Sequence, residues 1–425
     1  MNDASGNPAA HAPGQPTVAV IGDGQLARMM QTAAIELGQS VRLLAGGREA
    51  SAAQVAADVL LGDYRDLEDL RAAARGADAV TFDHEHVPGE HLRALIEEGA
   101  SVHPGPHALL FAQDKLEQRT RLKELGFPVP RFRAVASPED ALAFYEEVQG
   151  RVCLKACRGG YDGHGVWFPE DREGLASLVE ELLGRGVDLL AEEKVLFDRE
   201  LSAMVARTPS GEVAAWPVVE SEQTDGICHR AIAPAPRMSA EQDRALRELA
   251  GDIARRLDVT GVLAVELFDR GGTYWVNELA MRPHNTGHWS QDGSATSQFE
   301  QHLRAVLDLP LGATTPTAPV TVMVNTLGGP EDPAEPLPDR MAQVWRRFPS
   351  AKIHLYGKDY RPGRKLGHVN LCGEDVAATV READLAAHYL VHGRWADGWA
   401  APAGSAAPAG TTGNTETTET TESAD

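Results

Sequence analysis

A lysine followed by a glycine-rich segment is the sharpest chemical signal in the sequence. Lys155 ends a short apolar run, and four glycines then fall within the seven residues 159–165. The ammonium group of a lysine and the backbone amides of such a loop suit the oxygens of a phosphate group. Because no Gly-Lys-Ser/Thr triplet follows, the segment is not a P-loop. The pattern predicts a flexible flap whose amides wrap a bound phosphate, with a plain hairpin turn as the alternative.

Two glutamates lie inside apolar, strand-like runs that the turn 269–272 joins. On adjacent strands of a hairpin, the carboxylates of Glu266 and Glu278 would lie close together on one face. Like charges at short range raise a pKa unless a cation lies between them. Oxygen ligands of this kind suit Mg²⁺, or alternatively Mn²⁺, bound jointly with nucleotide phosphates. The pair therefore predicts a metal–nucleotide site.

The loop after the second glutamate carries a cation, an imidazole and an amide, namely Arg282, His284 and Asn285. Beside a metal–phosphate site these groups could hold a reacting oxyanion. Zinc is the alternative, because His284 and His288 are four residues apart. No glutamate stands between the two histidines and no third ligand is evident, which disfavours zinc.

The segment Glu192–Val195, with Glu200 after it, has the features of a nucleoside-binding strand end. Its backbone groups can pair with the edge of an adenine ring. A carboxylate further along can accept hydrogen bonds from the ribose hydroxyls. A charged surface turn is the alternative interpretation, because three of the four residues in this segment are charged.

A local basic loop stands towards the C-terminal end of the chain. Four cations lie within the eight residues 358–365, namely Lys358, Arg361, Arg364 and Lys365. Because the whole chain carries a net charge of −22, so dense a cluster of cations is typical of phosphate capture. A solvated basic loop without a ligand is the alternative.

A Gly-x-Gly-x-x-Ala motif occupies residues 22–27, between a predicted strand and a predicted helix. Its glycines allow close backbone approach, and the helix N-terminus offers amide groups to an anion. A dinucleotide site would also need an acid at the end of the next strand, where two glycines and an arginine stand at 46–48. A packing turn, a phosphate or substrate contact, and an NAD site all stay open.

Four blocks of predicted secondary structure position these residues. In the first, strands Thr17–Ile21, Val41–Ala45 and Ala79–Phe82 alternate with helices, which predicts a parallel sheet. A continuous helix over 108–125 follows them. Two strands then flank the flap as a hairpin. An antiparallel α+β block comes next, and a short block with further strands begins after the Thr/Pro linker 314–319. The predicted fold class is α/β and α+β.

The composition limits the classes of partner. The chain has 425 residues, 43% of them apolar, with 40 Lys+Arg against 62 Asp+Glu. An acidic surface disfavours nucleic acid and anionic membranes as partners. No apolar run approaches the roughly 20 residues of a membrane helix. The N-terminus has no export signal and the four cysteines form no CxxC pair, so we expect a soluble, cytoplasmic protein with reduced thiols.

Taken in order along the chain, these motifs resemble the ATP-grasp superfamily. Within it they resemble the 5-(carboxyamino)imidazole ribonucleotide synthases, the ATP-dependent carboxylases of purine biosynthesis. The strings that carry the closer resemblance are GGYDGHG, NELAMRPHNTGHW, SQFEQHLRA and RPGRKLGHVN. The implied division is a disordered leader 1–16, a parallel-sheet (pre-ATP-grasp, Rossmann-like) domain 17–115, an ATP-grasp lid subdomain 116–190, an ATP-grasp large subdomain 191–313, a small β-rich C-terminal domain 319–395 and a disordered tail 400–425.

The resemblance also implies roles for individual residues. The residues implied to bind ATP are Lys115, Lys155, Gly160, Tyr161, Asp162, Gly163, His164, Gly165, Val166, Glu192, Glu193, Lys194, Val195, Glu200, Asn277 and Glu278. The residues implied to hold Mg²⁺ are Glu266 and Glu278. The residues implied to bind the ribonucleotide or the carboxylating intermediate are Gly24, Gln25, Leu26, Glu85, Tyr161, Asp162, Arg282, His284, Asn285, Lys358, Arg364 and Lys365.

The implied reaction uses ATP to phosphorylate bicarbonate, and the carboxyphosphate then carboxylates the exocyclic amine of aminoimidazole ribonucleotide. The implied catalytic residues include Lys155 and Arg282, and Arg282 would hold the carboxyphosphate. Asp162 is the first choice for the group that accepts the proton from the amine, and His284 is the second. The implied partners are these small molecules and a second copy in a homodimer. The alternatives are a formate- or amino-acid-dependent ATP-grasp ligase acting on a similar ribonucleotide and, remotely, an NAD-dependent oxidoreductase.

Overall fold

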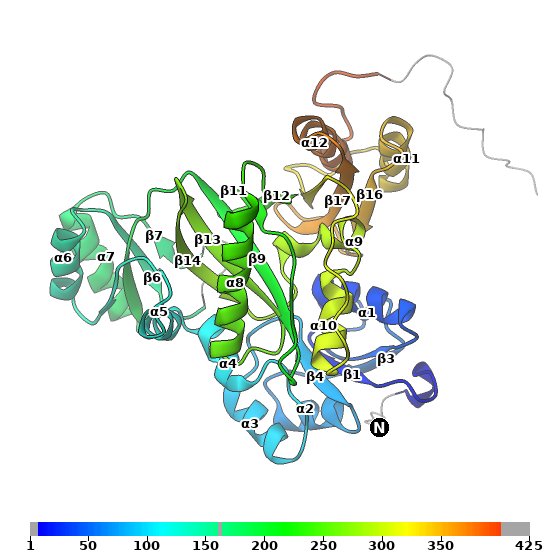
Figure 1. Ribbon diagram of the computed structural model, residues 1–425, viewed down its shortest axis with the longest axis horizontal. Helices are drawn as coiled ribbons and strands as arrows, with labels where there is room; N and C mark the ends of the chain where they lie inside the picture. Colours follow the sequence, from blue (N-terminus) through cyan, green and yellow to red (C-terminus); the bar gives the residue numbers. More distant parts are fainter. Residues whose placement is uncertain (1–6, 160–163, 401–425) are drawn as a thin grey trace, which may run out of the picture.

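A computed structural model describes residues 7–159 and 164–400 of the chain. Figure 1 shows an α/β body at the N-terminal end, a central body with long strands, a lobe with α6 and α7 on one side and a C-terminal part with α11 and α12. Within the described ranges the strands form three sheets, of four, nine and four strands. No helix in these ranges is both long enough and apolar enough to cross a bilayer.

The first sheet is parallel, as predicted, with the strand order β3-β2-β1-β4. Its strands are β1 (Val18–Ile21), β2 (Val41–Ala45), β3 (Asp58–Leu61) and β4 (Ala79–Phe82). Its helices are α1 (Gln25–Glu36), α2 (Leu67–Ala74), α3 (Gly89–Glu97), α4 (Pro106–Gln113) and α5 (Lys115–Glu124). Parallel strands end at one edge, so the turn after β1 and the segment after β4 lie side by side.

Residues 7–16 differ from the disorder expected for the leader 1–16. Pro8–Ala10 form a short 3-10 helix, the backbone amide of Asn7 donates to Asp58 Oδ1 over 2.8 Å, and His11 Nε2 lies 2.8 Å from Asp58 Oδ2. Asp58 is fully buried and also accepts from Arg42 Nε. A buried carboxylate must be paired, so the segment is ordered by contacts that its composition does not reveal.

The helix predicted over 108–125 is broken into α4 and α5 at Asp114. The Asp114 carboxylate accepts from the backbone amides of Leu116 and Glu117, which makes it the N-cap of α5. The break starts a new helix whose first turns carry Lys115 and Arg119. These two side chains share one helix face because they are four residues apart.

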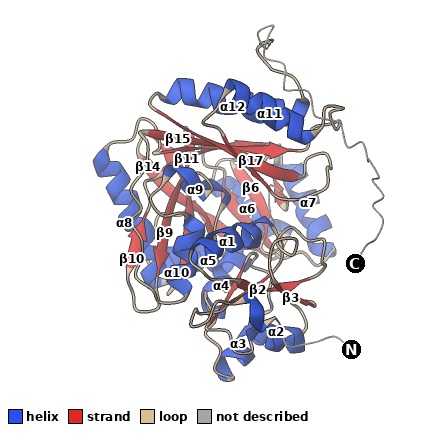
Figure 2. Cartoon of the chain, turned by 90° about the vertical axis from the view of Figure 1, so that its right-hand side faces the viewer, coloured by secondary structure: helices blue, strands red, loops and turns tan. Residues whose placement is uncertain are grey.

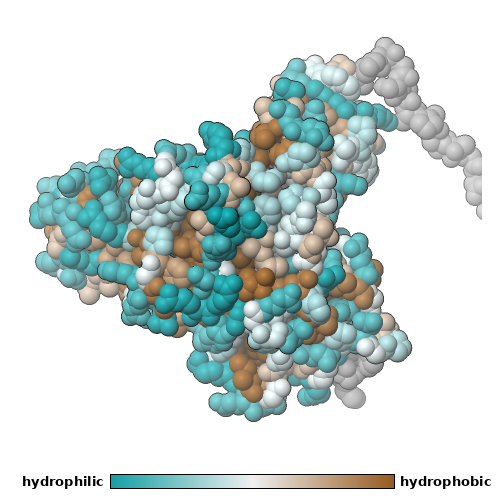
Figure 3. All heavy atoms as spheres, in the orientation of Figure 1, coloured by the Kyte–Doolittle hydropathy of each residue, from teal (hydrophilic) through white to brown (hydrophobic). Residues whose placement is uncertain are grey.

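The second sheet belongs to a small lobe with the strand order β5-β8-β6-β7. Its elements are β5 (Phe132–Val135), α6 (Pro138–Glu147), β6 (Val152–Ala156), β7 (Val166–Trp167), α7 (Arg172–Gly184) and β8 (Leu189–Glu193). The predicted hairpin is confirmed, because β6 and β7 pair antiparallel with Lys155 opposite Val166. We refer to this lobe as the lid. Its outer surface is hydrophilic, whereas hydrophobic residues gather nearer the middle of the molecule (Figure 3).

The third sheet has the order β14-β13-β9-β11-β12-β15-β17-β16, with β10 paired to β9. Its strands are β9 (Arg199–Arg207), β10 (Val213–Ala215), β11 (Val219–Thr224), β12 (Ile227–Ala233), β13 (Gly261–Arg270), β14 (Thr273–Ala280), β15 (Val320–Leu327), β16 (Lys352–Leu355) and β17 (Lys365–Gly373). Its helices are α8 (Ala240–Arg256), α9 (Ser290–Gly293), α10 (Gln298–Val306), α11 (Leu337–Arg347) and α12 (Val376–His392).

This sheet runs from the central body into the C-terminal block without a break. The connection is the antiparallel pair of β12 and β15, and β12 was not predicted because His229 and Arg230 interrupt its apolar pattern. Arg230 forms ion pairs with Glu222 and with Asp384 on α12. Figure 2 shows α11 and α12 lying across β15 and β17. The block predicted as a separate domain, 319–395, thus extends the central sheet.

Candidate active site

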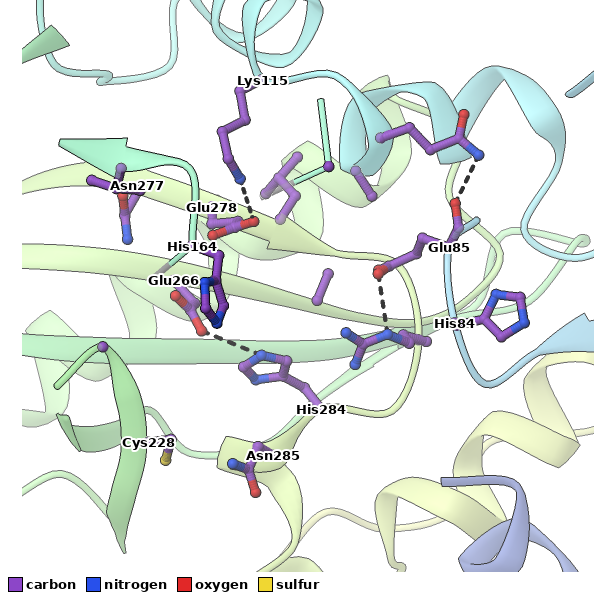
Figure 4. Close-up of a pocket in the computed structure, with 18 of the residues that line it drawn as sticks. His84, Glu85, Lys115, His164, Cys228, Glu266, Asn277, Glu278, His284 and Asn285 are labelled. Atoms are coloured by element: carbon purple, nitrogen blue, oxygen red, sulfur yellow. Dashed lines mark hydrogen bonds and ion pairs between the residues drawn. The ribbon is translucent and has the colours of Figure 1, made fainter. Parts of the chain in front are cut away.

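A cavity of about 1330 Å³ lies where the N-terminal sheet, the lid and the central sheet meet. Most of the residues predicted for the site line it (Figure 4). The predicted residues that line it are Gly24, Gln25, Leu26, Glu85, Lys115, Lys155, His164, Val166, Glu192, Glu193, Lys194, Val195, Glu200, Glu266, Asn277, Glu278, Arg282, His284, Asn285 and Lys365. Gly160, Tyr161, Asp162 and Gly163 lie outside the described residues.

The glutamate pair is placed as the hairpin pattern predicts. Glu266 on β13 is the register partner of Glu278 on β14, and both side chains project towards the cavity (Figure 4). A bulge beside this pair leaves Asn277 as an extra residue in β14. Burial, and then the charges of Glu278 and Glu200, hold the pKa of Glu266 well above its ordinary value. The two acids therefore form a concentrated negative site.

Lys115 supplies part of the compensating charge. Its Nζ lies 2.8 Å from Glu278 Oε1. Burial alone would raise the pKa of Glu278, but the ion pair and hydrogen bond with Lys115, together with the charges of Lys155 and Arg119, lower it. One carboxylate of the pair is thus held ionised while the other resists ionisation, which is the pattern expected where a further cation belongs.

Lys155 is held by a buried carboxylate that also binds Arg119. The Lys155 Nζ lies 2.5 Å from Glu192 Oε2, and Arg119 pairs with Glu192 Oε1. Glu192 is 2% exposed. Burial opposes its ionisation, but Arg119 and Lys155 lower its pKa to about 2. The predicted hinge role concerns the backbone of this segment, and the Glu192 side chain is engaged in fixing Lys155.

Arg119 is a site residue that the sequence analysis missed. Besides Glu192 it donates to the backbone carbonyl of Asn277, so it joins α5, the lid strand β8 and the bulge of β14. The available signal was its position four residues after Lys115, on the same helix face. An arginine that is 1% exposed acts here as the internal counter-ion of the lid.

The hinge end of the cavity also has aromatic walls that were not predicted. Phe197 stacks on Phe268 with ring centroids 4.7 Å apart, and Lys194 Nζ lies 5.0 Å from the Phe168 ring centroid. All three phenylalanines line the cavity. Exposed aromatic faces of this kind suit a flat heterocycle. Burial raises the pKa of Glu200, at the same end, to about 7.

Glu193 occupies the predicted hinge, but its side chain is engaged with the lid. Its carboxylate oxygens lie 2.8 Å from Arg131 Nε and 2.8 Å from Arg151 Nη2. Hydrogen bonds from these arginines lower its pKa. The Glu193 side chain therefore ties the hinge to the strands of the lid.

Arg282 and His284 line the cavity beside the glutamate pair. Glu85 accepts from the Met281 amide over 2.8 Å and from Arg282 Nε over 3.1 Å, so it orients the arginine. His284 Nε2 lies 3.3 Å from Glu266 Oε1. Burial, then Arg282 and Lys365, lowers the pKa of His284 to about 3. The imidazole is thus neutral near pH 7.

Asp83 was also not predicted as a site residue, and its carboxylate binds the backbone of the glycine motif. Its Oδ2 accepts from the Gly24 amide over 2.5 Å, and a Cβ at Gly22, where φ is +125°, would overlap its carboxylate. Burial raises the pKa of Asp83 to about 6. An amide needed by a dinucleotide pyrophosphate is already bonded to an acid, which disfavours the NAD interpretation.

The basic loop reaches the cavity only in part. Lys365 lines the cavity. Lys358 donates to Gln25 Oε1 over 2.5 Å, while Arg364 donates to the backbone carbonyl of Asp359 over 3.2 Å. Lys358, Arg364 and Gly165 are not among the lining residues. Lys358 therefore lies behind Gln25 at the N-terminus of α1.

The donor set of the glutamate pair is consistent with Mg²⁺ and not with zinc. Hard carboxylate oxygens face a space large enough for nucleotide phosphates and water to complete an octahedral shell. Within residues 7–159 and 164–400, no group of three or more His, Cys, Asp or Glu side chains is arranged to hold a metal. His288, the alternative zinc ligand, instead bonds Gln298 and stacks on His368.

Three domain-family profiles match the chain in succession. They are the ribonucleotide synthetase preATP-grasp domain over 16–113, the ATP-grasp domain over 120–299 and the phosphoribosylaminoimidazole carboxylase C-terminal domain over 321–382. With the site geometry, these matches define an ATP-grasp enzyme, a ligase that forms a carbon–nitrogen bond.

Curated relatives identify the family within this class. The chain is 60% identical to N5-carboxyaminoimidazole ribonucleotide synthase of Corynebacterium ammoniagenes over 404 residues, covering 93% of this chain and 97% of that protein. It is 51% identical to the enzyme of the same name from Mycobacterium tuberculosis, with 90% of each chain covered. The chain belongs to the N5-carboxyaminoimidazole ribonucleotide synthase family.

Solved structures of similar fold come from enzymes of the same family. The N5-carboxyaminoimidazole ribonucleotide synthetase of Thermus thermophilus is 37% identical, with a TM-score of 0.79 over 89% of this chain and 99% of that one. The Aspergillus clavatus synthase in complex with ADP and 5-aminoimidazole ribonucleotide is 29% identical, with a TM-score of 0.79 over 88% and 98%. The fold therefore matches these synthases, one of which was crystallised with both a nucleotide and a ribonucleotide.

Proposed function

We propose that this chain carboxylates 5-aminoimidazole ribonucleotide to N5-carboxyaminoimidazole ribonucleotide in purine biosynthesis, consuming ATP and bicarbonate and giving ADP and phosphate. The observation that carries the proposal is a single cavity with two differently equipped ends. Glu266, Glu278 and Lys155 form the nucleotide end, and Arg282 and Lys365 stand at the other. A ligase that couples ATP to a second anionic substrate needs both ends in one enclosure.

At the nucleotide end, the adenine would bind between the aromatic walls and the hinge backbone, with Glu200 at the ribose. Mg²⁺ at Glu266 and Glu278 would neutralise charge on the terminal phosphates. Lys155 and Lys115 add fixed positive charge, and Glu192 orients Lys155 through its 2.5 Å ion pair. Preorganised charges of this kind stabilise a phosphoryl-transfer transition state without reorganisation.

At the substrate end, Arg282 would hold the carboxyphosphate because Glu85 fixes its guanidinium. His284 is neutral near pH 7, but its pKa of about 3 makes it a weak proton acceptor. Asp162, the first choice for this role, lies outside the described residues, so its role stays a prediction. A homodimer and a cytoplasmic location also stay predictions from the sequence.

The proposed function is tested by the substrate dependence of phosphate release. We expect rapid release from ATP only when bicarbonate and aminoimidazole ribonucleotide are both present. Release that depends on formate in place of bicarbonate would instead support the alternative ligase. A change in nicotinamide absorbance on turnover, with no phosphate release, would support the oxidoreductase.

Replacing Lys365 by alanine is expected to raise the KM for the ribonucleotide about tenfold or more, because one charge-assisted contact to its phosphate is lost. The KM for ATP is expected to change by less than about twofold, since Lys365 stands at the far end of the cavity from the hinge. Initial-rate measurements with each substrate varied in turn check this. A selective rise in the KM for ATP would show that Lys365 serves the nucleotide instead.

A further inference from the structure

The segment 356–358 attaches the C-terminal block to the N-terminal block directly behind the substrate end of the cavity. Tyr356 is 1% exposed and belongs to the hydrophobic cluster formed by β1 and α1, with Val20 and Leu26 among its members. The Tyr356 side chain also lines the cavity, and its hydroxyl lies 2.8 Å from His368 Nδ1. A residue from near the end of the chain thus completes the core of the first sheet.

Two side chains of the N-terminal block hold the backbone of this segment. Ser51 Oγ donates to the carbonyl of Tyr356 over 2.5 Å, and Gln54 Nε2 donates to the carbonyl of Gly357 over 2.7 Å. A Cβ at Gly357, where φ is +63°, would overlap Gln54 Oε1. At this point the backbone of Gly357 packs directly against the side chain of Gln54, with no room for a Cβ atom between them.

The same two residues are tied to the glycine turn before α1. Arg28 Nη1, on α1, donates to the Ser51 carbonyl over 2.8 Å and to Gln54 Oε1 over 3.1 Å. The amide of Ala52 donates to the Asp23 carbonyl over 2.9 Å. The short segment 51–54 thus contacts both α1 and the start of the basic loop, and it connects the two.

We propose that Ser51 and Gln54 are positioning residues for the phosphate of the ribonucleotide. By fixing the backbone at 356–357, they set Lys358, which donates to Gln25 at the start of α1, and the beginning of the loop that carries Lys365 to the cavity. Neither Ser51 nor Gln54 is among the residues that line the cavity, so neither contacts the substrate. This inference rests on the proposed function and adds the interface that assembles its phosphate subsite.

The physical argument is that the subsite is divided between two parts of the chain. Gln25 at the start of α1 and Lys365 at the end of the basic loop both line the cavity, and each alone attracts an anion weakly, so tight binding requires both at the correct separation. A shift of about 1 Å in such a site is enough to lose much of the binding energy. Fixing the separation by two short hydrogen bonds preserves the subsite when no ligand is bound.

The test uses Ser51→Ala and Gln54→Ala in the full-length enzyme. We expect each to raise the KM for aminoimidazole ribonucleotide about fivefold, the loss of roughly one net hydrogen bond, and the double variant to raise it more. The KM for ATP and the kcat at saturating ribonucleotide are expected to change by less than about twofold. Gln54→Glu removes the donor to Gly357 but keeps the acceptor for Arg28, so it is expected to behave like Gln54→Ala.

Gln242→Ala is the matched control. The Gln242 side chain also bonds the backbone, since it accepts from the amide of Ser239 in the capping box of α8, and Gln242 does not line the cavity. It is expected to cost similar stability with no change in either KM. ADP binding measured by calorimetry verifies that each variant retains the nucleotide end.

An unchanged KM for the ribonucleotide in both alanine variants would overturn the inference. An equal rise in the KM for ATP, or loss of ADP binding in both, would also overturn it, because the contacts would then support the whole cavity. Turnover of the unmodified enzyme separates the two proposals. If it needs no aminoimidazole ribonucleotide, the proposed function itself fails.

Discussion

Replacing Glu278 by glutamine is expected to lower kcat about a thousandfold while leaving the fold intact. The amide keeps the volume of the side chain but removes the charge that faces Glu266 across the hairpin and pairs with Lys115 at 2.8 Å. A metal held against the terminal phosphates contributes several kcal/mol to the transition state, and about 4 kcal/mol corresponds to this loss in rate. Phosphate release under saturating substrates measures the effect.

A second readout separates the loss of the metal site from a general defect. In the unmodified enzyme Mg²⁺ is expected to strengthen ADP binding, and in Glu278→Gln this dependence is expected to disappear. The matched control is Glu248→Gln, on the outer surface of α8, where the side chain is 71% exposed. Turnover of the Glu278 variant equal to that of the control would remove the metal assignment.

Replacing Arg119 by methionine is expected to destabilise the protein by about 3–5 kcal/mol, the usual cost of removing one partner of a buried ion pair. Glu192 would keep Lys155 but lose its second cation inside the lid. The carbonyl of Asn277 would also lose a donor. The midpoint of urea unfolding, followed by circular dichroism, measures this change.

Two comparisons test the reason for that loss. Arg255→Met removes an arginine that is 53% exposed on α8, and it is expected to change stability by less than about 0.5 kcal/mol. Adding Glu192→Gln to Arg119→Met removes the unpaired charge, so the double variant is expected to be less destabilised than the sum of the single changes. An additive result would show that the two side chains do not interact.

The same pair predicts a dependence of stability on pH. The folded-state pKa of Glu192 is lowered to about 2 from an ordinary value of 4.5. A lowered pKa means that the carboxylate stabilises the folded state fully above pH 4.5 and loses this contribution as the pH falls towards 2. Glu192→Gln is expected to be less sensitive to acid over this range. An identical acid dependence in both proteins would contradict the pairing.

Much of the site was predictable because its residues lie within short patterns. An apolar run with a two-residue period and a Gly-Gly turn defines a hairpin, so the sequence alone predicts Glu266 and Glu278 on adjacent strands. The turn by itself would place Glu266 opposite Asn277, and the bulge in the hairpin sets it opposite Glu278 instead. Lys155 at a strand end follows from a similar local pattern, and the two strands that flank the flap pair as predicted. Where a functional side chain lies within a segment of regular apolar spacing, the sequence predicts both the residue and the strand that carries it.

The tertiary structure alone decided which distant groups complete these patterns. Arg119 and Glu192 are 73 residues apart, and Ser51 and Tyr356 are 305 apart. The pairing of β12 with β15 joined the C-terminal block to the central sheet, and Asp83 reached the glycine turn from another strand. Periodicity and turn chemistry report only on neighbours in the chain. Buried charges and strand edges are satisfied by whichever group the complete packing brings near, and no local pattern encodes that choice.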